Sequence, residues 1–134
     1  MSIAYALEPD LSAEEFRAVL IASTLAEMRP VSDLDRLDRM LRNASLIITA
    51  RDGERLVGIS RAITDFSFCC YLSDLAVDAA YQRRGIGKRL IAETHRGAGE
   101  ESMLILIAAP AAEQYYPKIG MLQRPSCWTA PRSR

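Results

Sequence analysis

A short loop with two glycines and several basic side chains carries the clearest chemical information in this sequence. It reads Gln82-Arg83-Arg84-Gly85-Ile86-Gly87-Lys88 and joins a strand-like apolar stretch to a helix-like one. Glycine has no Cβ, so its backbone can come close to a ligand. The first turn of a helix also presents unpaired N–H groups and the positive end of the helix dipole. The loop is therefore typical of an anion site, and phosphate is the usual anion there.

The spacing excludes two well-known phosphate loops. A dinucleotide fingerprint needs a third glycine three residues after the second, where Leu90 stands. A P-loop needs a glycine five residues before the Gly-Lys pair and a Ser or Thr after it, where Gln82 and Arg89 stand. The stretch is either a different phosphate cradle or a plain tight turn with solvated basic side chains.

Composition argues against a nucleic-acid or membrane protein. Residues 1–134 are expected to form a single domain, with 49% hydrophobic and 25% charged residues. A formal net charge of zero argues against general affinity for nucleic acid or membrane. The N-terminal residues have no secretory pattern, and the most apolar run, Met103 to Ala112, is too short to span a bilayer. We therefore expect a cytoplasmic protein.

The three cysteines, Cys69, Cys70 and Cys127, do not have the spacing of metal ligands. Cys69 and Cys70 are neighbours in a strand-like run, so their side chains should point to opposite faces. We expect buried free thiols in a reducing compartment and no metal site.

Apolar spacing and turn residues predict the elements around the loop. In chain order we expect a strand at 3–7, helices at 11–22 and 32–43, strands at 45–50, 56–64 and 66–77, a helix from the loop to about 98, a strand at 102–108, a short helix at 111–119 and a last strand at 121–129. This order gives a mixed α/β fold, with antiparallel and parallel strands in one central sheet flanked by helices. One βαβ crossover falls at the glycine loop, where ligands of such sheets bind.

Two strands carry further information. Gly58, in the middle of an apolar run, indicates a bulge or a close backbone approach. The run 102–108 is almost entirely apolar, which favours a central strand covered on both faces.

The loop and its flanks resemble the acyl-CoA loop of the GNAT superfamily of N-acetyltransferases. Leu75-Ala76-Val77 is followed by Asp78-Ala79-Ala80-Tyr81 and then by the loop. The family pattern is Gln or Arg, two variable residues, Gly, one variable residue, and Gly or Ala, and Gln82, Gly85 and Gly87 match it.

A second block, Ala112 to Met121, resembles the later motif of the same family. The pattern is Ala, two variable residues, an aromatic residue, Tyr and, after a short run, Gly with an apolar residue, and the sequence reads AAEQYYPKIGM from Ala111. The expected element order is also that of the family. The likeness extends from about Leu56 to Met121.

The resemblance implies a site for acetyl-CoA as co-substrate. The backbone of Leu75, Ala76 and Val77 would pair with the pantetheine arm like an added strand. Backbone N–H groups from Arg83 to Lys88 would hold the pyrophosphate. Other cofactor contacts would come from Gln82, Gly85, Ile86, Gly87 and Tyr116, with the side chains of Arg83, Arg84 and Lys88 near the outer phosphates.

The resemblance also implies catalytic roles. Tyr116 falls on the position of a family tyrosine near the CoA sulfur, and a phenol can protonate a departing thiolate. The backbone N–H of Val77 would donate to the developing oxyanion. Tyr115, on the aromatic position, is expected to pack in the core.

Two positions depart from the family pattern. Tyr71 stands six residues before Val77, where some members have a glutamate as general base. Ala109 stands where many members have an asparagine. The base therefore stays open, and its candidates are Asp74, Asp65, Glu27 and a water molecule. His95 lies late in its helix, where a helix-end role is expected.

We therefore expect an N-acetyltransferase that moves the acetyl group of acetyl-CoA to a primary amine by direct attack in a ternary complex. The alternative is a non-catalytic acyl-CoA-binding sensor or regulatory module, because the glutamate and asparagine are missing. The acceptor would be a small-molecule or peptide amine in a groove lined largely by residues 11–43. A short last strand would leave an exposed sheet edge, which favours a homodimer.

Overall fold

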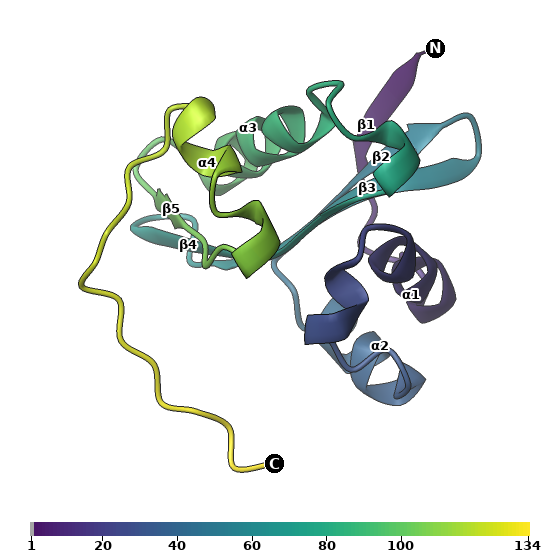
Figure 1. Ribbon diagram of the computed structural model, residues 1–134, viewed down its shortest axis with the longest axis horizontal. Helices are drawn as coiled ribbons and strands as arrows, with labels where there is room; N and C mark the ends of the chain where they lie inside the picture. Colours follow the sequence, from purple (N-terminus) through teal and green to yellow (C-terminus); the bar gives the residue numbers. More distant parts are fainter. Residues whose placement is uncertain (1) are drawn as a thin grey trace.

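A five-stranded mixed sheet in the order β1-β2-β3-β4-β5 forms the centre of the molecule (Figure 1). The computed structural model describes residues 2–134. The strands are β1 (Ile3–Leu7), β2 (Leu46–Asp52), β3 (Arg55–Thr64), β4 (Cys69–Val77) and β5 (Met103–Ile105). Neighbouring strands from β1 to β4 are antiparallel, and β4 and β5 are parallel. The predicted mixed α/β class is confirmed.

Helices cover both faces of this sheet (Figure 1). The α-helices are α1 (Ala13–Ala22), α2 (Leu34–Arg42), α3 (Ile86–Ala98) and α4 (Tyr115–Lys118), and the 3-10 turns are η1 (Leu25–Met28), η2 (Ala79–Tyr81) and η3 (Pro110–Ala112). Helices α1 and α2 pack on one face, through side chains such as Phe16 and Leu37 against Ile47. Helix α3 packs on the other face, where Leu90 meets Ile48. Neighbouring residues of β2 thus serve opposite faces, as the pleat of a strand requires.

Several predicted boundaries are confirmed together with their local causes. The Ser12 hydroxyl accepts the N–H of Glu15 at 3.1 Å and starts α1. The bulge predicted at Gly58 lies beside it, because Ala50 pairs with Gly58 and Arg51 pairs with Leu56, which leaves Val57 as an extra residue in β3. Side chains of α3 also approach Gly58, where a Cβ would lie 3.1 Å from Leu90 Cδ1 and 3.2 Å from Ile86 Cγ2. The second helix, predicted from residue 32, begins at Leu34, because the Asp33 side chain caps it and accepts the N–H of Arg36.

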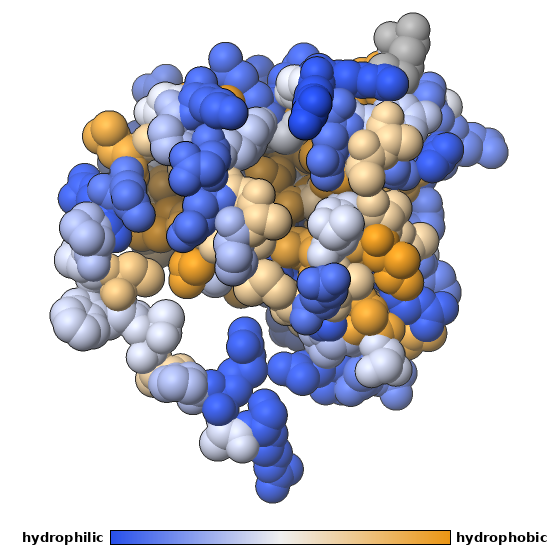
Figure 2. All heavy atoms as spheres, in the orientation of Figure 1, coloured by the Kyte–Doolittle hydropathy of each residue, from blue (hydrophilic) through white to orange (hydrophobic). Residues whose placement is uncertain are grey.

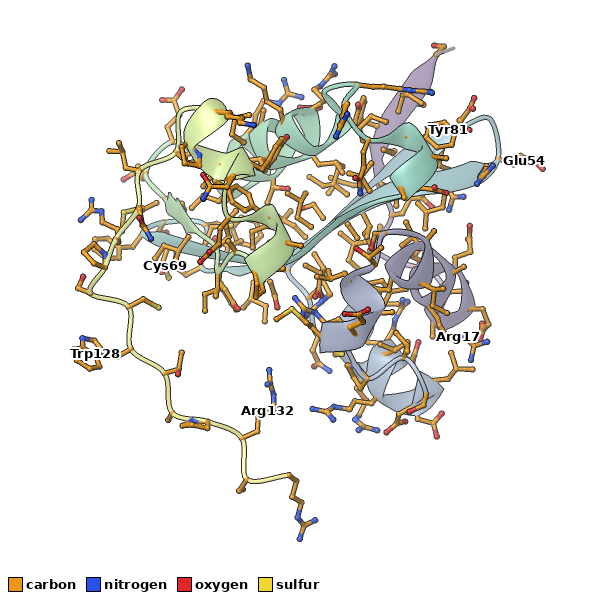
Figure 3. All side chains as sticks on the ribbon, viewed as in Figure 1. Arg17, Glu54, Cys69, Tyr81, Trp128 and Arg132 are labelled. Atoms are coloured by element: carbon orange, nitrogen blue, oxygen red, sulfur yellow. The ribbon has the colours of Figure 1, made fainter. Side chains whose placement is uncertain are left out.

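The C-terminal third differs most from the prediction. β5 is a three-residue strand at the sheet edge, and Met103, Ile105 and Ile107 are about half exposed, so the expectation of a doubly covered central strand was wrong. Residues 121–129 form no strand, and this segment is exposed and contains Pro125, which cannot donate a ladder hydrogen bond. Trp128 projects away from the sheet (Figure 3) and is 91% exposed. The predicted helix at 111–119 is a 3-10 turn followed by the four residues of α4.

Two smaller expectations were also corrected. The strand predicted from residue 66 begins at Cys69, because the Asp65 carboxylate accepts the N–H groups of Ser67, Phe68 and Cys69 in the preceding turn. Cys69 and Cys70 do point to opposite faces, but only Cys70 is buried, whereas Cys69 and Cys127 are exposed free thiols.

No helix between residues 2 and 134 is both long and apolar enough to cross a membrane.

Candidate active site

The candidate site starts at the point where β4 extends beyond its pairing with β5. β5 pairs only with Cys69, Cys70 and Tyr71, so the rest of β4, up to Val77, has no strand partner on that side within residues 2–134. The two strands therefore share a short parallel start, beyond which one edge of β4 is left open. In Figure 2, apolar residues gather across the middle of the face between the α3 side and the α1–α2 side, with hydrophilic residues around the rim.

A bulge in β4 determines which groups face this open edge. Arg61 pairs with Asp74 and Ala62 pairs with Leu72, so Ser73 is an extra residue in β4. Because of this extra residue, Leu72 and Leu75 both pack on the α3 face. Asp74 is turned to the other face, where it meets Arg29, which directly follows η1, and Arg61 of β3.

The hydrogen-bond register beyond the bulge points two backbone positions at the open edge. The Asp78 N–H donates to the Val57 carbonyl at 2.8 Å, so Asp78 and Val57 are a hydrogen-bonded pair of the antiparallel ladder. Such pairs alternate with pairs whose N–H and C=O groups point away from each other. Val77, opposite Gly58, and Leu75 therefore direct their N–H groups toward the open edge. The N–H of Ala76, which lies between them, is directed at β3.

The glycine loop continues directly from this edge and forms an uncapped helix start. Arg83 has φ 65° and Gly85 has φ 80°, so two residues of the loop adopt the left-handed conformation. Gly85 is the N-cap of α3 and offers no side chain to the N–H groups of the first turn. Those N–H groups and the helix dipole favour an anion. The left-handed Arg83 is a strained position of the kind found at ligand sites.

Side chains of the loop hold its shape. Gln82 donates from Nε2 to the Val77 carbonyl at 3.0 Å and so joins the loop to the end of β4. The Tyr81 hydroxyl donates to Asp52 at 2.7 Å, and Tyr81 lies beside the β2–β3 turn that carries Glu54 (Figure 3). The guanidinium of Arg84 lies over the Tyr81 ring at 5.2 Å from its centroid. Gln82 and Arg84 therefore position the loop, while the exposed side chains of Arg83 and Lys88 lie at the surface.

Helix α4 brings two tyrosines to the start of α3. A Cβ built on Gly87 would lie 3.0 Å from the hydroxyl oxygen of Tyr115. The Tyr115 and Tyr116 rings are in edge-to-face contact, with centroids 5.4 Å apart. Burial raises the pKa of Tyr116, and the neighbouring Tyr115 raises it further. The Tyr116 phenol is therefore protonated at neutral pH and can donate a proton.

The carboxylates proposed as general base are each engaged or exposed elsewhere. Asp74 is fully buried, and its two oxygens accept hydrogen bonds from Arg29 Nε and Arg61 Nε. Asp65 lies in the β3–β4 turn, where three backbone N–H groups lower its pKa to about 2. This turn is at the opposite end of β4 from Val77. Glu27 is exposed on η1.

Arg29 and Arg61 were not anticipated as part of this region. Arg29 also donates to the Ser73 carbonyl at 2.8 Å, and Arg61 donates to the Ser73 hydroxyl at 3.0 Å, so both hold the bulge residue itself. The sequence did contain a signal for a buried ion pair, because Arg61 and Asp74 are opposite charges that each lie inside an apolar strand run. Arg29 gave no such signal, because it lies between two helical segments.

His95 has the helix-end position that was expected for it. Its Nε2 lies 2.7 Å from the Ser102 carbonyl, just beyond α3. Within the described residues, no group of three or more His, Cys, Asp or Glu side chains is placed to hold a metal ion.

Comparison with known proteins identifies the family. Residues 8–123 match the acetyltransferase (GNAT) domain. The chain belongs to the GNAT acetyltransferase family. Among curated relatives, this GNAT chain is 30% identical over 98 residues to an uncharacterized N-acetyltransferase of Pyropia yezoensis, covering 69% of this chain and 56% of the relative. A similar protein of Gracilaria tenuistipitata is 28% identical over 91 residues, covering 66% of this chain and 50% of the relative. The GNAT chain thus spans about half the length of these relatives.

Solved structures show the same fold. A probable acetyltransferase from Staphylococcus aureus superposes with a TM-score of 0.80 at 22% identity, covering 99% of each chain. The aminoglycoside N-acetyltransferase AAC(6′)-Iy in complex with CoA superposes with a TM-score of 0.75 at 14% identity, covering 99% of this chain and 96% of that one. The predicted family and fold are therefore confirmed.

Proposed function

We propose that this protein is an N-acetyltransferase that moves the acetyl group of acetyl-CoA to a primary amine. The observation that carries the proposal is the continuity of the open β4 edge with the uncapped start of α3. Val77 and Leu75 direct N–H groups to that edge, and the loop after Val77 leads into a helix start that favours an anion. Acetyl-CoA matches both features, because its extended arm suits the open β4 edge and its pyrophosphate suits the start of α3.

The chain's own residues suit this cofactor. Leu75 and Val77 would take the amide-containing arm as an added strand. The N–H groups from Gly85 to Lys88 would take the pyrophosphate, because Gly85 leaves them without a side-chain cap. The exposed side chains of Arg83 and Lys88 would reach the outer phosphates. Ile86 is buried beneath the loop and supports it by packing in the α3 core.

The proposed chemistry is direct attack of the neutral amine on the thioester carbonyl. A C–N bond forms as the C–S bond breaks, the Val77 N–H donates to the carbonyl oxygen that becomes negative, and Tyr116 gives its proton to the departing thiolate. The raised pKa of Tyr116 keeps its proton available at neutral pH. The amine would lose its proton to water, because Asp74 is engaged by two arginines and Asp65 lies at the opposite end of β4 from Val77.

A Tyr116→Phe variant tests this assignment, with Tyr5→Phe as the matched control on β1. Acetyl transfer is measured over a panel of amines, amino acids, aminoglycosides, polyamines and peptide N-termini. We expect Tyr116→Phe to lower kcat by about 100-fold, the lower end of the usual acid–base contribution, with the Kd of acetyl-CoA changed less than twofold. Equal turnover by Tyr116→Phe and wild type would contradict the acid role. Tight binding of acetyl-CoA with no turnover of any amine would favour the sensor function.

We also propose that two copies associate through an exposed apolar strip on the β3–β4–β5 end of the sheet. Ile63, Tyr71 and Ile105 lie in one cross-strand row and are 50%, 40% and 44% exposed. Met103 and Ile107 extend the row along the β5 segment. Together these side chains expose on the order of 400 Å² of apolar surface, about the apolar share of one side of a standard interface. Light scattering should give a dimer mass for wild type and a monomer mass for Ile105→Lys, and a wild-type monomer would refute the dimer.

A further inference from the structure

We propose that the Tyr115 hydroxyl occupies part of the phosphate cradle and leaves it when the cofactor's pyrophosphate binds, so that α4 moves with cofactor occupancy. This inference rests on the proposed function, because it assumes that the cradle takes a pyrophosphate. It assigns Tyr115 a positioning role that differs from the core packing expected from the sequence.

The contact between Tyr115 and the start of α3 is a close one. The hydroxyl oxygen would be 3.0 Å from a Cβ on Gly87, and the ring carbon Cζ 3.6 Å from it. A Cβ at this position would require the phenol to give way by a few tenths of an ångström. Gly87 is the second residue of α3, so the hydroxyl lies among the N–H groups of the first helical turn.

One of those N–H groups interacts with the phenol. The backbone N–H of Lys88 is a hydrogen-bonding neighbour of the Tyr115 hydroxyl and opposes the rise in its pKa that burial causes. The phenol remains neutral, so its interaction with this N–H is one between neutral groups. Hydrogen bonds to an ionised acceptor are roughly twice as strong, and the dipole of α3 adds to the preference for an anion. A phosphate oxygen should therefore replace the phenol at the Lys88 N–H.

Helix α4 is built to move at low cost. It has four residues, none of them buried, and the 3-10 turn before it also contains no buried residue. Segments with few buried contacts open most readily. Because Tyr116 follows Tyr115 directly and the two rings are in contact, displacement of Tyr115 also moves Tyr116. Occupancy of the pyrophosphate position would thus be transmitted to the residue proposed as the acid.

Binding of two ligands to Tyr115→Phe tests the inference. The variant keeps the ring but removes the hydroxyl that competes for the Lys88 N–H. CoA carries the pyrophosphate, and acetyl-pantetheine lacks it. We expect Tyr115→Phe to bind CoA about fivefold more tightly than wild type, the range expected for releasing one neutral hydrogen bond. Its Kd for acetyl-pantetheine should stay within twofold, and Tyr5→Phe should change neither. Weaker or unchanged CoA binding, or an equal change for both ligands, would overturn the inference.

A second measurement follows ligand binding in the wild-type sequence and uses a variant only to assign the signal. The protein is labelled with 3-fluorotyrosine, and the Tyr115 signal is assigned from its loss in Tyr115→Phe. CoA should shift the Tyr115 and Tyr116 fluorine signals, whereas acetyl-pantetheine should leave the Tyr115 signal in place. A Tyr115 signal that CoA does not shift would refute the displacement. Failure of CoA to bind wild type at all would instead refute the proposed function.

Discussion

The buried carboxylate of Asp74 should contribute more to stability than any other acidic side chain near the site. Its side chain is fully buried, and it faces Arg61, whose side chain is 8% exposed, and Arg29, whose side chain is 20% exposed. Asp74→Asn keeps the shape but leaves two guanidinium groups without their counter-charge. Breaking a buried pair in this way costs about 3–5 kcal/mol. For a domain of this size, that loss corresponds to a fall in Tm of about 10–15 °C.

Urea unfolding followed by circular dichroism measures the effect, and Asp38→Asn provides the control. Asp38 also pairs with an arginine, Arg42, at 3.5 Å, but its side chain is 54% exposed. An exposed pair of this kind is worth less than about 1 kcal/mol, so the control should unfold close to wild type. The midpoint for Asp74→Asn should fall while the slope stays the same. A loss below about 1 kcal/mol for Asp74→Asn would refute the reasoning that burial makes this pair costly to break.

Three further predictions concern other parts of the chain. Gly58→Ala should destabilise the protein by about 1–3 kcal/mol in urea unfolding, because its Cβ would lie 3.1 Å from Leu90 and 3.2 Å from Ile86; unchanged stability would show that α3 shifts freely. Arg83→Gly should relieve the strain at φ 65° and raise the urea midpoint slightly while it weakens CoA binding measured by calorimetry; a lower midpoint would contradict this. The folded pKa of Asp65, about 2, is below its ordinary 3.8, so the folded state binds fewer protons and stability is lost as pH falls from about 4 to 2. Asp65→Asn should lack this loss in thermal scans across that range, and an unchanged pH profile would count against the turn's role.

The fold could be predicted wherever local chemistry and burial agree. The Ser12 cap and the start of α3 at the glycine loop each depend on neighbouring residues that are visible in the sequence. The edge position of β5 could not be predicted. A run of apolar residues looks the same in the sequence whether both faces of the strand are covered or only one. Coverage is a tertiary property, and here neither a sixth strand nor a helix covers its outer face within residues 2–134.

The candidate site was predictable in its backbone and less so in its side chains. The loop motif placed Gly85 and Gly87 at the start of α3, where the structure also has them. Gln82 donates to the Val77 carbonyl and Arg84 lies over the Tyr81 ring, so both side chains also hold the loop in shape. These partners are near in sequence, but the spacing of the loop motif does not encode the contacts.

The bulge at Ser73 gives the residues of β4 two different roles, because one extra residue changes the faces to which the following side chains point. It turns Asp74 toward Arg29 and Arg61, which hold the Ser73 carbonyl and hydroxyl, and it leaves Leu75 and Val77 with N–H groups directed at the open edge. A carboxylate engaged by two arginines cannot also serve as a mobile proton acceptor. The structural role of Asp74 therefore follows from the same geometry that exposes the backbone donors. In the proposed mechanism, the protein would supply the oxyanion donor and the acid, and the acceptor amine would lose its proton to solvent.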